Sequence, residues 1–219
     1  MMKRTQVIQR LIDKYHAKSY LEIGLDNPDA NYEHIICGSK ECCDPYDRNI
    51  GTGIDEMTPQ RKAEIERDIL TYKMTSDEMF AGMPPERKYD LVFIDGLHLE
   101  MQVGRDIVNS LRHLNPGGHV VVHDCLPALR EWQEETRTTV CWTGSVWKAL
   151  PKLAEQGVSY YVVDTDLGCG VVTFGGDPWK LEYPEPSGLD WDDVFSDAIT
   201  RNGTMHVITV DEFIRITRP

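Results

Sequence analysis

Short apolar segments alternate with amphipathic segments along most of the chain. Between the apolar segments, residues 5–16, 75–83 and 100–114 repeat apolar side chains at intervals of three and four, as on one face of a helix. The apolar segments have the length of β-strands, and they cover residues 19–24, 40–45, 68–74, 89–95, 119–124, 159–165 and 169–176. Strands that alternate with helices form a mostly parallel sheet covered on both faces. The pattern therefore predicts an α/β fold, a Rossmann-like three-layer sandwich with a mostly parallel seven-stranded sheet.

The length of 219 residues suits one domain with a full-sized core. We expect residues 1–176 to form this domain. The tail, residues 177–219, is rich in acid, Trp and Pro, and we expect it to pack on the same domain as a C-terminal extension with a helix at 191–199. Residues 46–60 carry turn-forming residues and little periodicity, so they predict a loop.

Three shorter features complete this picture. Residues 29–36 can form one or two helical turns with Asp29 as N-cap. The segment 75–83 starts at Thr75 or Ser76, and the segment 144–157 predicts a helix interrupted near Pro151.

The charge of the chain narrows the class of ligand. The formal net charge is -13, which repels phosphate backbones and anionic lipid and so argues against nucleic acid and membrane partners. The sequence has no run of 18 apolar residues and no apolar segment of a signal peptide near its start, so we expect a cytoplasmic protein. Its six cysteines form no CxxC pair, which indicates reduced thiols rather than a zinc site.

Acids stand at four of the first five predicted strand ends. In a parallel sheet these ends share one edge, where ligands bind. Gly24 ends the first strand, and Asp44 follows it by twenty residues, the spacing at which an acid binds ribose hydroxyls. The loop after Gly24, "LDNPDA", lacks further glycines, and its acids would repel a pyrophosphate. The expected ligand is therefore an adenosine cofactor without phosphates, such as S-adenosylmethionine, whose sulfonium suits an acidic edge.

At this point the chain resembles a known family. The segments "YLEIG", "CCDP", "MTSDEMF", "YDLVFIDGLHLEMQVGRDIVNSLRHLNPGGHVVVHDC", "GSVWKAL" and "VVDTDLGCGVV" follow one another as in class I S-adenosylmethionine-dependent methyltransferases. The resemblance covers roughly residues 5–175 and is strongest to a small bacterial and phage group near the metal-dependent O-methyltransferases. It departs from the family in the loop "LDNPDA", where members usually carry another glycine or small residue.

The resemblance implies cofactor contacts along the predicted edge. Glu22 and Gly24 would line the methionine end, Asp44 would bind the ribose, and Ser76 and Asp77 would contact adenine. Asp95 would lie next to the methyl donor. The neighbours of these residues, Leu25, Pro45 and Gly96, would complete the cofactor site.

The same resemblance places catalysis at the ends of the fourth and fifth strands. In metal-dependent members Asp95 is a metal ligand, and a second acid pair stands where this chain has His123 and Asp124. One interpretation is that Asp95 and Asp124, with His123 or His98, bind Mg²⁺ or Mn²⁺, which would activate a substrate hydroxyl. The other is that His98 or His123 acts as general base without a metal. Both imply in-line methyl transfer governed by positioning.

Other features leave the substrate open. Residues 126–143 and the tail would cover the acceptor site, and Trp132, Trp142 and Trp147 lie in or near this segment. Asp164 and Asp166 suit either the site or a turn between two strands. We expect a small-molecule acceptor and a homodimer. Two alternatives have a different character: a non-catalytic adenosine-binding protein, or a nucleotide-linked dehydrogenase, which would need the missing glycine-rich loop.

Overall fold

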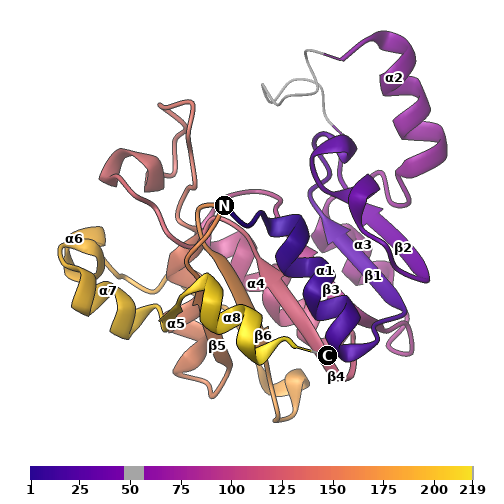
Figure 1. Cartoon of the computed structure of the whole chain (residues 1–219). Helices are drawn as coiled ribbons and strands as arrows, with labels where there is room; N and C mark the ends of the chain where they lie inside the picture. The colour runs from indigo at the N-terminus through magenta and orange to yellow at the C-terminus, as the bar shows by residue number, and fades with distance from the viewer. Residues whose placement is uncertain (47–56, 219) are drawn as a thin grey trace.

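A seven-stranded sheet forms the centre of the computed structural model, which describes residues 1–46 and 57–218 (Figure 1). The strand order is β2-β1-β3-β4-β6-β5-β7. The strands are β1 (Ser19–Ile23), β2 (Ser39–Cys43), β3 (Tyr89–Ile94), β4 (Leu114–Val122), β5 (Ser159–Val163), β6 (Cys169–Thr173) and β7 (Val207–Ile208). Only β6 runs antiparallel to its two neighbours, β4 and β5. The predicted α/β class and the mostly parallel seven-stranded sheet are therefore confirmed.

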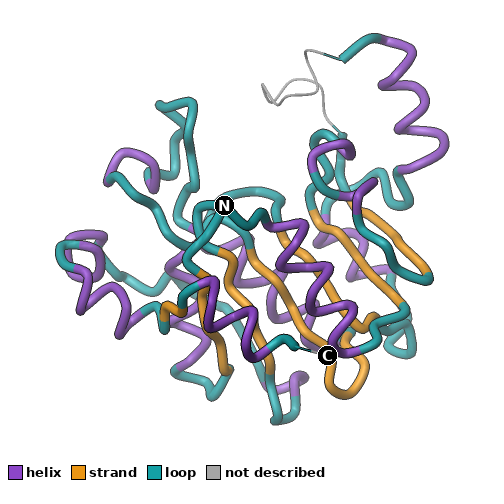
Figure 2. Tube along the Cα trace, in the orientation of Figure 1, coloured by secondary structure: helices purple, strands orange, loops and turns teal. Residues whose placement is uncertain are grey.

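Helices cover both faces of this sheet (Figure 2). The α-helices are α1 (Arg4–Tyr15), α2 (Pro59–Glu64), α3 (Ser76–Gly82), α4 (Glu100–Arg112), α5 (Ala149–Ala154), α6 (Trp191–Phe195), α7 (Ala198–Thr204) and α8 (Val210–Ile216). Shorter helical turns are η1 (Pro28–Ala30), η2 (Tyr32–His34), the π-helix η4 (Ile65–Ile69), η5 (Arg130–Gln133), η6 (Val146–Lys148) and η7 (Pro178–Lys180). No helix in the described part of the chain is long and apolar enough to cross a membrane.

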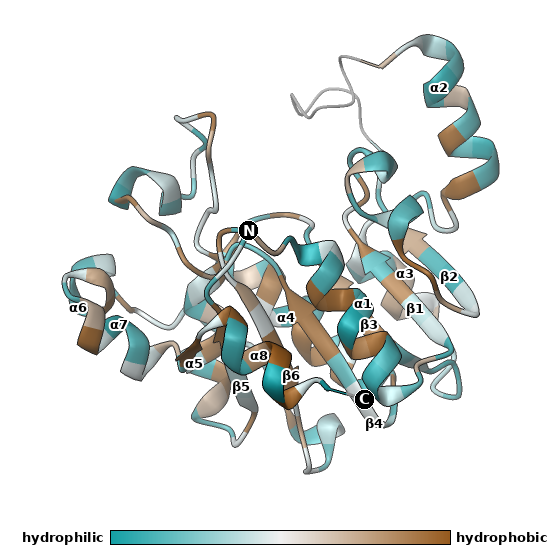
Figure 3. Ribbon diagram, viewed as in Figure 1, coloured by the Kyte–Doolittle hydropathy of each residue, from teal (hydrophilic) through white to brown (hydrophobic). Residues whose placement is uncertain are grey.

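The core consists of two apolar layers, one on each face of the sheet. Alternate residues of a strand point to opposite faces, so Val92 and Val120 join one layer whereas Phe93 and Val121 join the other. The first layer packs against α3, α4 and α5, and the second packs against α1 and α8. In Figure 3 only part of β4 is coloured as apolar, and its last three residues, Val120–Val122, are the buried ones, as expected for the central part of a sheet covered on both faces.

One of the seven predicted strands is wrong. Residues 68–74 do not form a strand: residues 65–69 are a π-helix, and Tyr72 makes only an isolated bridge to Cys43. The reason is that Ile65 and Ile69 lie four residues apart, so a helical turn brings both against the core layer that contains α1. The seventh strand is instead β7, which comes from the tail and pairs with β5.

The tail, residues 177–218 in this structure, continues the domain. Besides β7 it supplies α8, whose Phe213 is fully buried beside α1. The Arg10 side chain of α1 donates hydrogen bonds to Ile214 and Thr217 in this helix and directly after it. The buried Glu100 accepts a hydrogen bond of 2.8 Å from the Tyr183 hydroxyl. The division at residue 176 stays a prediction.

Local signals in the sequence have mixed outcomes. Thr75 is the N-cap of α3, with the Glu78 side chain reaching back to complete a capping box. Asn27, not Asp29, caps the turn η1, since its side chain accepts from the Asp29 amide. Pro151 lies in the first turn of α5, where a missing N–H costs no hydrogen bond, and the interruption takes the form of η6. The predicted loop 46–60 lies mostly outside the described residues.

We predict that Gly24→Ala destabilises the fold by about 2 to 5 kcal/mol, because a Cβ there would lie 2.2 Å from the Asp95 carbonyl oxygen and the φ of Gly24 is +86°. Urea unfolding measures the change. Gly82→Ala is the matched control, since nothing lies within 4 Å of its Cβ position. It should be neutral or stabilise by up to about 1 kcal/mol. Equal stabilities of the two variants would contradict the close approach.

Candidate active site

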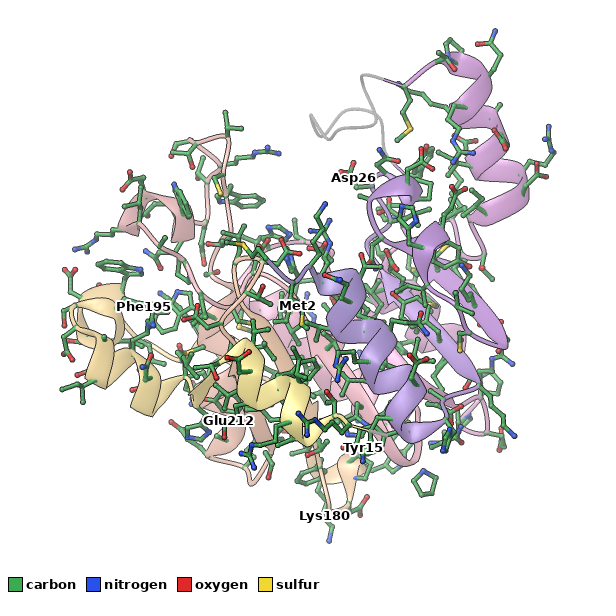
Figure 4. All side chains as sticks on the ribbon, viewed as in Figure 1. Met2, Tyr15, Asp26, Lys180, Phe195 and Glu212 are labelled. Atoms are coloured by element: carbon green, nitrogen blue, oxygen red, sulfur yellow. The ribbon has the colours of Figure 1, made fainter. Side chains whose placement is uncertain are left out.

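A cavity of about 320 Å³ opens at the carboxyl ends of β1, β2 and β3. This is the edge at which ligands bind in open parallel sheets, and the volume is that of a small-molecule site. Figure 4 labels Asp26 on the loop that follows β1. The cavity is lined by Ile23, Gly24, Asp26, Cys43, Asp44, Pro45, Thr75, Ser76, Asp95, Gly96, Leu97, Gln102 and Asp106. Six of the nine predicted cofactor residues are in this set.

Gly24 brings the ends of β1 and β3 into contact. Its amide donates to the Cys43 carbonyl at 2.9 Å, and the Asp95 amide donates to the Ile23 carbonyl at 2.8 Å. These bonds extend the parallel pairing past the ends of the strands. The absence of a side chain at Gly24 therefore keeps the cavity floor open beside Asp95.

Asp44 is held in place by backbone amides. Its carboxylate accepts from the Leu25 amide at 2.8 Å and from the Tyr46 amide at 2.6 Å. Leu25 thus contributes its backbone to the positioning of Asp44, while its side chain is buried in the core outside the cavity lining. Two fixed donors leave the remaining lone pairs of the carboxylate for hydroxyl donors of a ligand.

Glu22 lies behind the cavity rather than in its lining. Its side chain is 2% exposed and accepts hydrogen bonds of 2.5 Å from the Tyr20 hydroxyl and 2.9 Å from the Asn31 amide. Burial raises the pKa of Glu22 to about 8. The sequence could not separate this role from a cofactor contact, because both require an acid near the end of the same strand.

Asp77 is not among the residues that line the cavity, although it accepts a hydrogen bond of 3.3 Å from the side-chain amide of Gln102. It forms an ion pair with Arg105 at 3.3 Å, and its side chain is 46% exposed. The buried acid near this end of the cavity is Asp106 of α4. The sequence analysis missed Asp106 and Gln102, although two polar residues four apart directly before the core positions Val103 and Ile107 are a usable signal.

Beside the cavity, Asp95, His98 and Asp124 converge. His98 Nε2 lies 3.4 Å from Asp95 Oδ1, and His98 Nδ1 lies 3.3 Å from Asp124 Oδ2. One ligand atom of each residue lies within 4.8 Å of the others. Burial lowers the pKa of His98, but the two carboxylates outweigh this effect and the pKa is raised. The imidazole therefore bridges two acids from the ends of β3 and β4.

His123 also contacts both of these acids. Its Nδ1 is 3.3 Å from Asp95 Oδ1 and 3.2 Å from Asp124 Oδ1, and its Nε2 is 3.8 Å from Asp166 Oδ2. Burial opposes the charged imidazole, but the neighbouring Asp95 and Asp124 carboxylates raise the pKa of His123 well above its usual value. Burial likewise opposes the charged form of Asp95, and the two histidines hold its pKa well below the usual value.

Arg4 and Asp166 complete a cluster of six charged side chains. The Arg4 amide donates to Asp166 Oδ2 at 2.7 Å, and its guanidinium Nε lies 3.6 Å from Asp95 Oδ2. The proximity of His123 lowers the pKa of Asp166 to about 2. Asp166 thus belongs to the site as well as to a turn, where its φ is +48°. Nothing in the sequence singled out Arg4, because basic residues near a chain start are common.

The segment 126–145 covers this cluster. Trp142 stacks on His98 with ring centroids 5.0 Å apart, and its carbonyl oxygen lies 3.2 Å from His98 Nδ1. Gly144, with φ of +58°, has no room for a side chain against the His98 carbonyl oxygen. Trp147, in contrast, is fully buried and packs on Phe195 in the tail. Of the three tryptophans considered, Trp142 is the one that contacts the cluster.

The residues present fit a divalent cation. Two carboxylates and one imidazole are a donor set for Mg²⁺ or Mn²⁺. Asp124 Oδ1 is buried, and among the described residues it has an ion-pair contact of 3.2 Å with His123 Nδ1 but no hydrogen bond of regular geometry. Of the two histidines that the sequence analysis considered, His98 belongs to this set, and its two ring nitrogens each face one of the acids. His123 contacts the same two acids through its Nδ1 alone.

We predict that Glu22→Gln changes how stability depends on pH. Above about pH 4.3 the unfolded state loses the Glu22 proton, whereas the native state keeps it up to a pKa of about 8. Native stability therefore falls as the pH rises through this window. One proton changes the free energy of unfolding by about 1.4 kcal/mol per pH unit. Between pH 5.5 and pH 7.5 the free energy of unfolding should therefore fall by about 2 to 3 kcal/mol more in the wild type than in Glu22→Gln.

Urea unfolding at both pH values checks this prediction. Glu135→Gln is the control, because Glu135 is exposed and should keep the wild-type slope. Identical slopes for wild type and Glu22→Gln would show that Glu22 is ionised in the native protein.

The comparisons with known proteins agree with this geometry. Residues 19–125 match a family model described as a methyltransferase domain. No protein of curated function matches the sequence. Among solved structures, cofactor-bound Rv0187 from MTB has a TM-score of 0.52 and 16% identity over 78% of this chain and 80% of that one.

A second similar structure is the O-methyltransferase TomG from Streptomyces achromogenes, involved in tomaymycin synthesis and solved in complex with S-adenosylmethionine. Its TM-score is 0.51, with 16% identity over 78% of this chain and 79% of that one. Such identities establish the fold. The family match covers β1 to β4 and, of the cluster, Asp95, His98, His123 and Asp124. Residues 19–125 thus match a methyltransferase domain, and the chain shares the fold of the solved O-methyltransferase TomG.

Proposed function

We propose that the protein transfers the methyl group of S-adenosylmethionine to a hydroxyl oxygen of a small molecule, with a divalent cation held by Asp95, His98 and Asp124. One observation carries this proposal. Asp95 lines the cavity at the strand ends and is also a member of the cation-type donor set. A methyl donor in the cavity would therefore lie directly beside the place where the acceptor is held.

The cavity suits a cationic cofactor without phosphates. Its lining carries four carboxyl groups, from Asp26, Asp44, Asp95 and Asp106, and the described lining includes no Lys or Arg. Such a surface repels a pyrophosphate and attracts a sulfonium. This argues against a nucleotide-linked dehydrogenase. The solved O-methyltransferase TomG, bound to S-adenosylmethionine, gives the proposal a precedent on the same fold.

Positioning is the main contribution expected from this chain. Methyl transfer is an in-line displacement, so the acceptor oxygen must lie behind the methyl group at near contact. The segment 126–145 closes one side of the cluster through Trp142, and Gly144 fixes that segment against His98. When bound, a divalent ion would lower the pKa of the acceptor hydroxyl. The His123 imidazole would hold Asp95 and Asp124 in the orientation for binding it.

The geometry favours the cation over a histidine base. Both ring nitrogens of His98 face carboxylate oxygens, and its raised pKa keeps it protonated to higher pH. A protonated imidazole enclosed by two acids cannot accept a proton from a hydroxyl, and a cation that binds His98 would displace this proton, as metal binding by histidine requires. The homodimer and the cytoplasmic location expected from the sequence stay predictions.

The first test is calorimetric titration with S-adenosylhomocysteine, in the presence of EDTA and then of MnCl₂. We expect micromolar binding in both conditions, because the cavity itself holds the cofactor. Mn²⁺ alone should also bind, at about one ion per chain. Failure of S-adenosylhomocysteine to bind in either condition would favour a non-catalytic protein of the same fold.

We predict that His98→Ala weakens Mn²⁺ binding by at least about tenfold, since even partners of metal ligands contribute about 10- to 100-fold to affinity. Electron paramagnetic resonance of free and bound Mn²⁺ measures the affinity without any substrate. His34→Ala is the control, because His34 is exposed on the turn η2 away from the cluster. Unchanged affinity in His98→Ala would remove His98 from the donor set and restore His123 as the candidate.

A further inference from the structure

We propose that Asp106 of helix α4 selects adenine in the cofactor cavity by accepting a hydrogen bond from its exocyclic amino group. The inference rests on the proposed function, because it takes the ligand of the cavity to be an adenosine cofactor. It assigns the recognition of adenine to Asp106, which the sequence analysis did not consider, instead of to Asp77.

The position of Asp106 supports this role. Its side chain lines the cavity and is only 1% exposed, so its polar atoms have almost no contact with bulk water. The Gln102 amide donates to Asp106 Oδ1 at 3.0 Å and to the Ser76 hydroxyl oxygen at 3.1 Å. These three side chains form one polar wall where α4 packs against the start of α3.

The surroundings of Asp106 favour an additional hydrogen-bond donor from a ligand. A buried carboxylate is unfavourable unless charged or hydrogen-bonding groups compensate it. Among the described residues, no Lys, Arg or His lies within ion-pair distance of Asp106, and its partners are neutral. Burial raises the pKa of Asp106 to about 7. Its hydrogen-bonding neighbours, Gln102 and Ser76, carry no charge, so a ligand that brings an N–H group to this carboxylate would stabilise its ionised form.

Asp77 has the opposite surroundings. It carries the same functional group on the neighbouring residue of Ser76, but Arg105 pairs with it at 3.3 Å on the surface. The ion pair already compensates its charge, and solvent reaches almost half of its side chain. Asp77 therefore needs no ligand donor, and it provides a matched comparison in the same region.

The polar wall of Ser76, Gln102 and Asp106 lies where the adenine base of an adenosine ligand is expected. Asp95 and Gly24 lie at the end nearest the catalytic cluster, where the sulfonium is expected. Asp44 at the end of β2 is oriented by two backbone amides for the ribose hydroxyls. Ser76, Gln102 and Asp106 remain for the base. A carboxylate only accepts hydrogen bonds, so it favours the amino group of adenine over the oxo group of hypoxanthine at the same position.

The test compares S-adenosylhomocysteine with S-inosylhomocysteine, in which an oxo group replaces the amino group and N1 carries a hydrogen. Calorimetric titrations at pH 8 keep Asp106 ionised. The wild type should prefer S-adenosylhomocysteine at least about 30-fold, since a site built to bind a donor rejects an analogue that lacks it. Asp106→Asn should weaken the binding of S-adenosylhomocysteine at least about tenfold. It should also reduce the preference for this ligand over S-inosylhomocysteine at least about tenfold, because the Asn amide can donate to the oxo group. Asp77→Asn should keep both affinities within about twofold.

Three results would overturn the inference. The first is a wild type that binds the two ligands equally, which requires no variant and so is independent of any folding defect. The second is Asp106→Asn with the wild-type preference. The third is loss of the preference in Asp77→Asn alone, which would return the role to Asp77. A wild type that binds neither ligand would overturn the proposed function as well, and this outcome is distinct from the other three.

Discussion

The contact between Gly24 and Asp95 is the constraint on which the rest of the site depends. It joins the ends of two parallel strands so closely that no side chain can stand between them. On one side of this contact the cavity opens, and on the other the Asp95 carboxylate turns toward His98, His123 and Arg4. Asp95 therefore belongs both to the lining of the cavity proposed for the cofactor and to the donor set proposed for the cation.

The cluster around Asp95 is stable because opposite charges gather from distant parts of the chain. Asp95, Asp124 and Asp166 are three acids, and Arg4, His98 and His123 are the three bases that face them. Each of these groups would be unfavourable if buried alone. Four segments supply them: the start of α1, the ends of β3 and β4, and the turn between β5 and β6. The site therefore forms only when the whole sheet has assembled.

The tail, residues 177–218, packs against elements that carry residues of the site. β7 extends the sheet beyond β5, and α8 packs beside α1, whose first residue is Arg4. On the other face Tyr183 packs over Gly104, where a side chain would collide with its ring, and donates to Glu100 at the start of α4. The tail thus packs against both helices that carry site residues, α1 and α4. It is part of the machinery that positions the site, although it contains none of the cluster residues.

The sequence by itself determined the fold class and the edge of the sheet at which chemistry occurs. Hydrophobic periodicity and the alternation of elements are local properties, so the strands that end at Gly24, Asp44, Asp95 and Asp124 could be predicted from nearby residues. Capping at Thr75 could be predicted for the same reason. The error at residues 68–74 arose where a short apolar run suits a helical turn as well as a strand.

Only the tertiary structure decided which side chains meet. Glu22, Asp77 and Asp106 are all acids near the same edge, but one is buried behind the cavity, one is paired with Arg105 and one lines the cavity. The difference depends on partners that the fold brings together, such as Arg105 for Asp77, and Ser76 with Gln102 for Asp106. The different surroundings of His98 and His123 have the same origin. Burial and pairing are properties of the assembled fold, and local sequence patterns do not contain them.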